Sequence, residues 1–171
     1  MEKQVKRPFF WALTLETFRS GSIAAVAMIP FGLLFFALGL RVNEYGLKVI
    51  RTFFGDQPAG VRFVLFAVEH FIISWSVSIP LLLTLLATHR KFPAFVVGLV
   101  YGAGFYVLMN SLALPWIFGD LPPWQLGFEV IYPSLIIHLI YGIVIALTSR
   151  MFINRYTNQL KTNIPKLGAG A

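Results

Sequence analysis

The stretch that decides the fold is residues 94–118, AFVVGLVYGAGFYVLMNSLALPWIF, which contains no charged residue and ends just before Asp120. A helix needs about 20 mostly apolar residues to cross the hydrocarbon core of a bilayer, which is about 30 Å thick. Helices and closed barrels are the structures that satisfy their own backbone in lipid. Residues 94–118 are therefore predicted to form a transmembrane helix.

Three further apolar stretches of similar length lie on either side of it, at residues 21–40, 63–86 and 130–152. The whole chain is 57% hydrophobic and 12% charged, whereas soluble domains are about 45–50% apolar and about 25% charged. We therefore expect an all-α fold, in which residues 1–171 form a single integral membrane bundle of four transmembrane helices.

The distribution of Lys and Arg predicts how the bundle is oriented. Most of the 14 basic residues precede the first stretch, join the second to the third, or follow the fourth, whereas the other side has Arg41, Lys48, Arg51 and Arg62. Short loops rich in Lys and Arg stay in the cytoplasm, so both termini are predicted to be cytoplasmic. The net charge of +7 then reflects topology and anionic headgroups, not binding of nucleic acid.

The segments between and beyond these stretches carry separate predictions. Residues 1–20 are expected to be a cytoplasmic amphipathic lead-in that either lies in the headgroup plane or extends the first helix. Residues 41–62 form an outer loop, in which residues 45–54 have the pattern of an interfacial helix. Residues 153–171 are expected to be a cytoplasmic tail, which after Asn154 is polar and predicted to be mobile.

Four polar residues stand inside the predicted helices, where such residues are costly and usually face the interior of the bundle. Glu69, His70, Asn110 and His138 lie about seven or eight residues, or about 10–12 Å, from the outer ends of their helices. His70, Asn110 and His138 are predicted to converge into an intramembrane polar node. Glu69 points about 100° away from His70, and it either flanks this node, reaches outward or meets Arg62.

Rows of small residues support the same arrangement, because residues four apart share a helix face and small ones let helices approach closely. Gly98, Gly102 and Gly142 are predicted to be helix-packing residues. The rows that contain the polar residues are His70–Ser74–Ser78, Gly98–Gly102–Tyr106–Asn110 and Ser134–His138–Gly142–Ala146.

Three interpretations of the histidines remain open. The first is interhelical hydrogen bonding that fixes the packing. The second is a proton-responsive site that gains charge below about pH 6 to 7. The third is a metal or haem site with His70 and His138 as ligands, although no cofactor is the first expectation. The sequence has no cysteine and none of the HExxH, GxxxxGK or GxSxG motifs, so the protein is predicted not to be an enzyme.

With these residues in view, the chain resembles the YagU-like family of small bacterial inner-membrane proteins. The resemblance covers residues 64–146 and rests on residues 69–74, Lys91-Phe92-Pro93, residues 110–115, residues 120–124 and an acidic residue shortly before His138. It implies a multi-pass protein of the bacterial inner membrane, associated with acid resistance. In that family a histidine often stands at the position of Asn110, and this departure weakens a three-histidine metal site.

Three functions follow from these interpretations. The first is a YagU-like membrane protein that acts in acid-stress or envelope physiology through its polar node. The second is a haem- or metal-binding, or accessory, subunit of a membrane electron-transfer complex. The third is a structural packing subunit, in a homo-oligomer or a larger membrane complex. In each case the lipid bilayer is the immediate partner.

Overall fold

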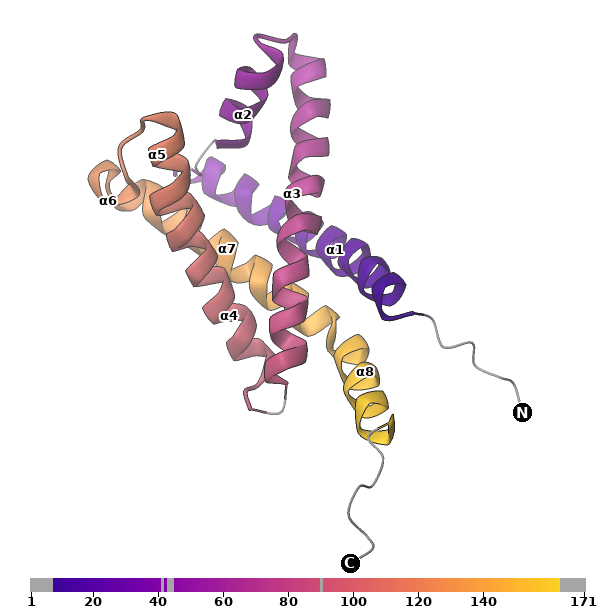
Figure 1. Ribbon diagram of the computed structural model, residues 1–171. Coiled ribbons are helices and arrows are strands. Elements are labelled where there is room, and N and C mark those ends of the chain that lie inside the picture. The colour runs from indigo at the N-terminus through magenta and orange to yellow at the C-terminus, as the bar shows by residue number, and fades with distance from the viewer. Residues whose placement is uncertain (1–7, 41, 43–44, 90, 164–171) are drawn as a thin grey trace, which may run out of the picture.

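The computed structural model describes residues 8–40, 42, 45–89 and 91–163, and over these ranges it contains helices and no strand (Figure 1). Four helical segments are long and apolar enough to cross a membrane: Phe9–Ala37, Ala59–Thr88, Ala94–Phe118 and Phe128–Thr148. The predicted all-α bundle of four membrane-spanning helices is therefore confirmed.

The first span, α1 (Phe9–Ala37), begins well before the predicted residue 21. Of the two alternatives for the lead-in, the structure has the one in which it extends the first helix. The part that precedes residue 8 lies outside the described residues. The helix continues because its polar side chains are satisfied: Arg19 donates to the Glu16 carboxylate at 2.5 and 3.0 Å and to the carbonyl oxygen of Thr148 at 2.6 Å.

The outer loop contains a helix, α2 (Tyr45–Phe54), that packs alongside the first half of α3 (Ala59–Thr88) (Figure 1). A short turn after Gly55 joins the two into a hairpin. A methyl group placed on Gly46 would lie 2.8 Å from the Glu69 carboxylate and 3.1 Å from the Phe66 ring. The face of α2 that contains Gly46 is therefore turned toward α3.

The third span consists of three consecutive pieces, α4 (Ala94–Phe105), the π-helix η1 (Tyr106–Ala113) and α5 (Leu114–Phe118). A π-helix closes i→i+5 hydrogen bonds and is rare, because its extra residue per turn loosens the helix. The span ends at Gly119, whose φ of 64° is the left-handed conformation that favours glycine at a helix end. A short helix, α6 (Pro123–Leu126), follows before the last span.

The last span, α7 (Phe128–Thr148), ends four residues earlier than predicted and is followed by α8 (Arg150–Asn163). The tail after Asn154, predicted to be mobile, is helical as far as Asn163, while residues 164–171 lie outside the described residues. Packing explains the difference, because α8 buries Ile153 and Thr157 against the bundle. The rings of Phe9 and Tyr156 also meet edge to face at 5.5 Å.

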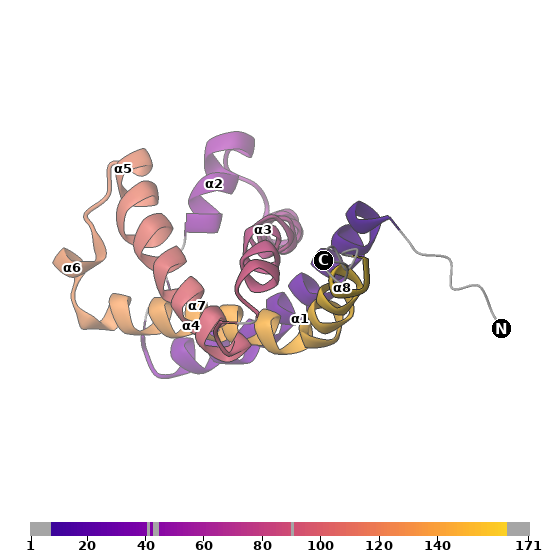
Figure 2. The ribbon, with the colours of Figure 1, turned by 60° about the horizontal axis from the view of Figure 1, so that its bottom comes forward.

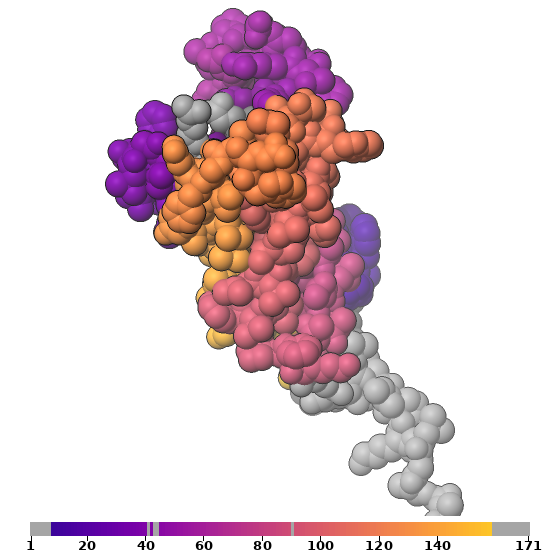
Figure 3. Space-filling view, turned by 90° about the vertical axis from the view of Figure 1, so that its left-hand side faces the viewer, coloured from indigo at the N-terminus to yellow at the C-terminus, as the bar shows by residue number. Residues whose placement is uncertain are grey.

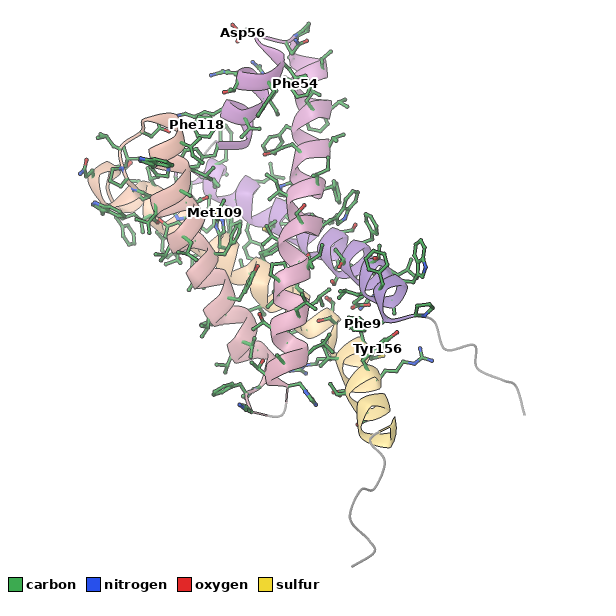
Figure 4. All side chains as sticks on the ribbon, in the orientation of Figure 1. Phe9, Phe54, Asp56, Met109, Phe118 and Tyr156 are labelled. Atoms are coloured by element: carbon green, nitrogen blue, oxygen red, sulfur yellow. The ribbon has the colours of Figure 1, made fainter. Side chains whose placement is uncertain are left out.

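The contact of Phe9 with Tyr156 places the start of α1 and helix α8 at one end of the molecule, and Figure 2 shows α1 and α8 side by side. Phe54 and Asp56, at the turn between α2 and α3, lie at the opposite end (Figure 4). We call these two ends the terminal side and the α2 side. Successive spans run in opposite directions, so the loop after the first span and the loop after the third lie on the same side. This agrees with the position of α2 and of the turn that contains Asp120 on one side.

Candidate functional site: polar groups between the spans

His138 lies on α7, and its backbone is in contact with Gly102 of α4. By colour, Figure 3 shows α7 beside the third span. Its Nδ1 donates to the carbonyl oxygen of Ser134 at 2.6 Å. Since a carbonyl oxygen can only accept, this bond fixes the tautomer and leaves Nε2 as an acceptor. The imidazole is stacked on Phe105 at 5.7 Å and meets the Tyr106 ring edge to face at 5.6 Å.

Asn110 and Tyr106 lie on η1, within the same span that packs on His138, and both are buried with 8% and 5% of their surface exposed. The Tyr106 hydroxyl has no hydrogen-bond partner in the part of the chain that the structure describes. Ser111 is near enough to interact with this hydroxyl, but not in hydrogen-bonding geometry. A buried polar group without a partner is uncommon in native proteins and calls for an explanation.

His70 occupies a different interface, between α3 and α1. Its Nε2 donates to the carbonyl oxygen of Ala25 at 3.2 Å, and its ring stacks on Phe66 at 6.1 Å. Over the described residues, no hydrogen bond or ring contact joins His70 to His138 or Asn110. The structure therefore places His138 and Asn110 on the two elements of one crossing, and it turns His70 toward another helix.

The reason is that the row His70–Ser74–Ser78 begins its packing on α1. Ser74 donates to the carbonyl oxygen of Gly21 at 2.8 Å, one turn from the contact of His70 with Ala25. Small residues of α1 thus pack against the polar face of α3. The row was predicted from the sequence, but its partner helix was not.

Glu69 is half-buried, with its carboxylate against Gly46 of α2. No ion pair joins it to Arg62 or to another described residue. Within the same part of the chain, no group of three His, Cys, Asp or Glu side chains could hold a metal ion. The two histidines lie at different helix interfaces, His70 between α3 and α1 and His138 between α7 and the third span.

The strongest polar cluster between the spans was missed, because it centres on a tyrosine. The Tyr141 hydroxyl donates to the carbonyl oxygen of Ser74 at 2.6 Å and lies 3.1 Å from the Ser78 hydroxyl. Together with the bond from Ser74 to Gly21, these contacts join α7 to α3 and α3 to α1. Tyr141 stands three residues after His138, which places it about one helical turn further along the same face. This spacing could have indicated that Tyr141 also lies between the helices.

The glycine rows form the crossing of α4 with α7. A methyl group on Gly98 would lie 2.7 Å from the Ala146 side chain, and one on Gly102 would lie 2.9 Å from the backbone carbon of His138. A methyl group on Gly142 would lie 3.0 Å from the backbone carbon of Gly98. The two backbones are thus in direct contact, as small residues permit inside membranes.

A second polar cluster lies on the α2 side. Lys48 forms an ion pair with Asp120, and its ammonium group stands 5.7 Å from the centre of the Tyr45 ring. Tyr45 is 8% exposed and stacks on Phe118 at 5.9 Å. Burial, with the negative charge of Asp120 and a smaller contribution from Tyr106, raises the pKa of Tyr45, so its phenol remains a hydrogen-bond donor at neutral pH.

Comparison with known proteins gives no match: no protein-family model, curated protein or solved structure is similar to this chain. The fold and the sites described above therefore define it as a multi-pass α-helical membrane protein, and its function has to be argued from its own residues.

Proposed function

We propose that this chain is a non-enzymatic membrane protein of the YagU-like type, that it acts in acid-stress or envelope physiology at a bacterial inner membrane, and that His138 is its proton-responsive group. The observation that supports this best is the setting of His138. Its Nδ1–H is held by the carbonyl oxygen of Ser134, so the second nitrogen is left to accept a proton. Imidazole is the side chain whose ordinary pKa lies closest to physiological pH.

The surroundings of His138 suit a charge that forms and disappears. The stacked Phe105 ring presents its face to the imidazole at 5.7 Å, and aromatic faces attract cations within about 6 Å. The free hydroxyl of Tyr106 supplies a polar atom on the neighbouring span. These two groups could stabilise the imidazolium without a fixed counter-ion.

The position of His138 also connects its charge to the packing of the bundle. The backbone of His138 is in contact with Gly102, at the point where α4 continues into the π-helix. π-Helical segments occur frequently at functional sites, where a helix can change its register. Protonation of His138 would therefore act on the crossing of α4 with α7, and this is how a proton could alter the shape of the bundle.

Survival of acid shock in the native host tests this proposal. Cells without the gene are complemented with the wild-type protein, with His138→Asn or with His70→Asn. We expect cells with His138→Asn to lose acid survival. Cells with His70→Asn should survive, because His70 is bonded to α1. Equal survival with all three proteins, at equal membrane levels, would overturn the assignment of His138.

A purely structural role is the second candidate, and the cluster of Tyr141 with Ser74 and Ser78 favours it. In that case the polar groups hold the helices together within a larger assembly. His138→Asn would then be almost silent, whereas Gly102→Leu would be severe. The His70–His138 haem site has no comparable observation in its favour.

A further inference from the structure

The third span runs from the contact with His138 to the cluster on the α2 side, and it has buried polar residues in its η1 part. Following η1 from Tyr106 toward α5, Asn110 and Ser111 come about one turn later, and both are buried with 8% and 6% exposure. The span then ends at Phe118, against which Tyr45 of α2 is stacked. The pair of Lys48 with Asp120 stands beyond it, with its side chains 43% and 27% exposed.

Electrostatics supports this arrangement. Burial is the main cause of the raised pKa of Tyr45, and Asp120 and Tyr106 both add to it, so both lie within electrostatic range of Tyr45. Tyr106 in turn touches the His138 ring. Polar side chains thus lie at intervals between the half-exposed ion pair and the half-buried imidazole of His138.

The other titratable groups on the elements that pack against α7 are engaged elsewhere. Tyr101 of α4 donates to the carbonyl oxygen of Val77 at 2.9 Å, and His70 of α3 donates to Ala25. Glu16 and Arg19 of α1 pair with each other near Thr148, at the terminal side. Glu69 lies against α2. Within the described residues, Tyr106 is the titratable side chain whose ring contacts His138.

We infer that water and protons reach His138 from the α2 side, along the row Asp120, Tyr45, Ser111, Asn110 and Tyr106, and that α2 covers this route. The inference rests on the proposed function and adds to it the side from which the protein senses pH. The ion pair of Lys48 with Asp120 holds α2 over the route, so breaking the pair opens it.

The absence of cysteine from the chain allows a direct test. Single cysteines replace Ser111 and, separately, Asn110, in membrane vesicles of known orientation. A charged, membrane-impermeant methanethiosulfonate reagent is then added to one side at a time. We expect Ser111→Cys, which is almost isosteric, and Asn110→Cys to be labelled from the α2 side and not from the terminal side.

Matched positions serve as controls. Asp120→Cys and Asn154→Cys should be labelled from the α2 side and the terminal side respectively, and they establish the orientation. Gly104→Cys is in the same span, but a side chain there has no neighbour within 4 Å. It should face lipid and stay unlabelled, because the reagent requires a thiolate in water.

The ion pair provides a second readout. Lys48→Met in the Ser111→Cys protein should accelerate labelling, while Arg51→Met, an exposed position on the same helix, should leave the rate unchanged. Ser111→Cys that stays unlabelled, or is labelled from the terminal side, while Asp120→Cys reacts as expected, would overturn the route. Failure of His138 to titrate in the wild-type protein would instead overturn the proposed function, so the two failures are distinguishable.

Discussion

At the scale of single residues, Tyr141 is the side chain whose hydroxyl joins the last span to α3. It donates to Ser74 and also contacts Ser78. The carbonyl oxygen of Ser74 has the Ser78 hydroxyl as a second donor, so removing the phenol does not leave it without a partner. Stability should therefore fall by about 0.5–1.5 kcal/mol, the usual net value of one hydrogen bond.

This is measured as the loss of unfolding free energy of Tyr141→Phe in mild detergent. Tyr132→Phe is the matched control, because Tyr132 is 40% exposed and its ring packs on Phe35 and Phe128. The role given to Tyr141 is contradicted if both substitutions have the same effect.

Arg19 makes a second prediction at this scale. Its guanidinium satisfies the Glu16 carboxylate, whose side chain is 9% exposed, and bonds to Thr148 at the end of α7. Arg19→Met leaves that carboxylate without its donors and should cost about 1–3 kcal/mol. Thermal unfolding measures the loss. We expect the further change Glu16→Gln to restore stability. If the double variant is no more stable than Arg19→Met, the charge of Glu16 is not the cause of the loss.

At the scale of the helices, the crossing of α4 with α7 depends on the absence of side chains. A leucine at Gly102 would collide with the backbone of His138, whereas one at Gly104 would meet nothing within 4 Å. Gly102→Leu should therefore destabilise by more than about 3 kcal/mol, beyond the usual cost of overpacking. Gly104→Leu in the same span should be tolerated.

The comparison is made by the yield of monodisperse protein and its melting temperature in detergent. Similar behaviour of the two leucine variants would mean that the crossing is not as tight as described.

The helix scale also shows what could be predicted from the sequence. The spans were predictable because each long apolar stretch has charged residues near its ends. The glycine row was predictable because residues four apart lie on one helix face. The partner of the row His70–Ser74–Ser78 was not predictable, because a helix face says nothing about which neighbour it meets. The π-helix was missed because its residues continue the apolar pattern of the surrounding span. Helix α8 was missed because residues 150–163 are mostly polar.

At the scale of the whole molecule, the bundle exposes a large apolar surface, as residues that face lipid require. Trp116 and Phe36 are 86% and 81% exposed. Among the described residues, polar groups gather between the spans in the Tyr141 cluster and at the crossing with His138. Others form the ion pair on the α2 side and the Arg19–Glu16 pair on the terminal side. The placement of His138 and Asn110 on two neighbouring spans was predictable from the rows of small residues that each of them shares. Their separation from His70 required the packing of α1 on α3.

The measurement that tests the central claim most directly is a nuclear magnetic resonance titration of the protein in lipid nanodiscs, with the histidine rings labelled with nitrogen-15. Spectra between about pH 4 and 8 cover the range in which an imidazole takes up a proton. His138→Asn and His70→Asn assign the signals. The account predicts that the His138 Nε2 takes up a proton within this range, with a shift in signals from the α4–α7 crossing. A His138 ring that stays neutral throughout, in a folded bundle, would contradict it.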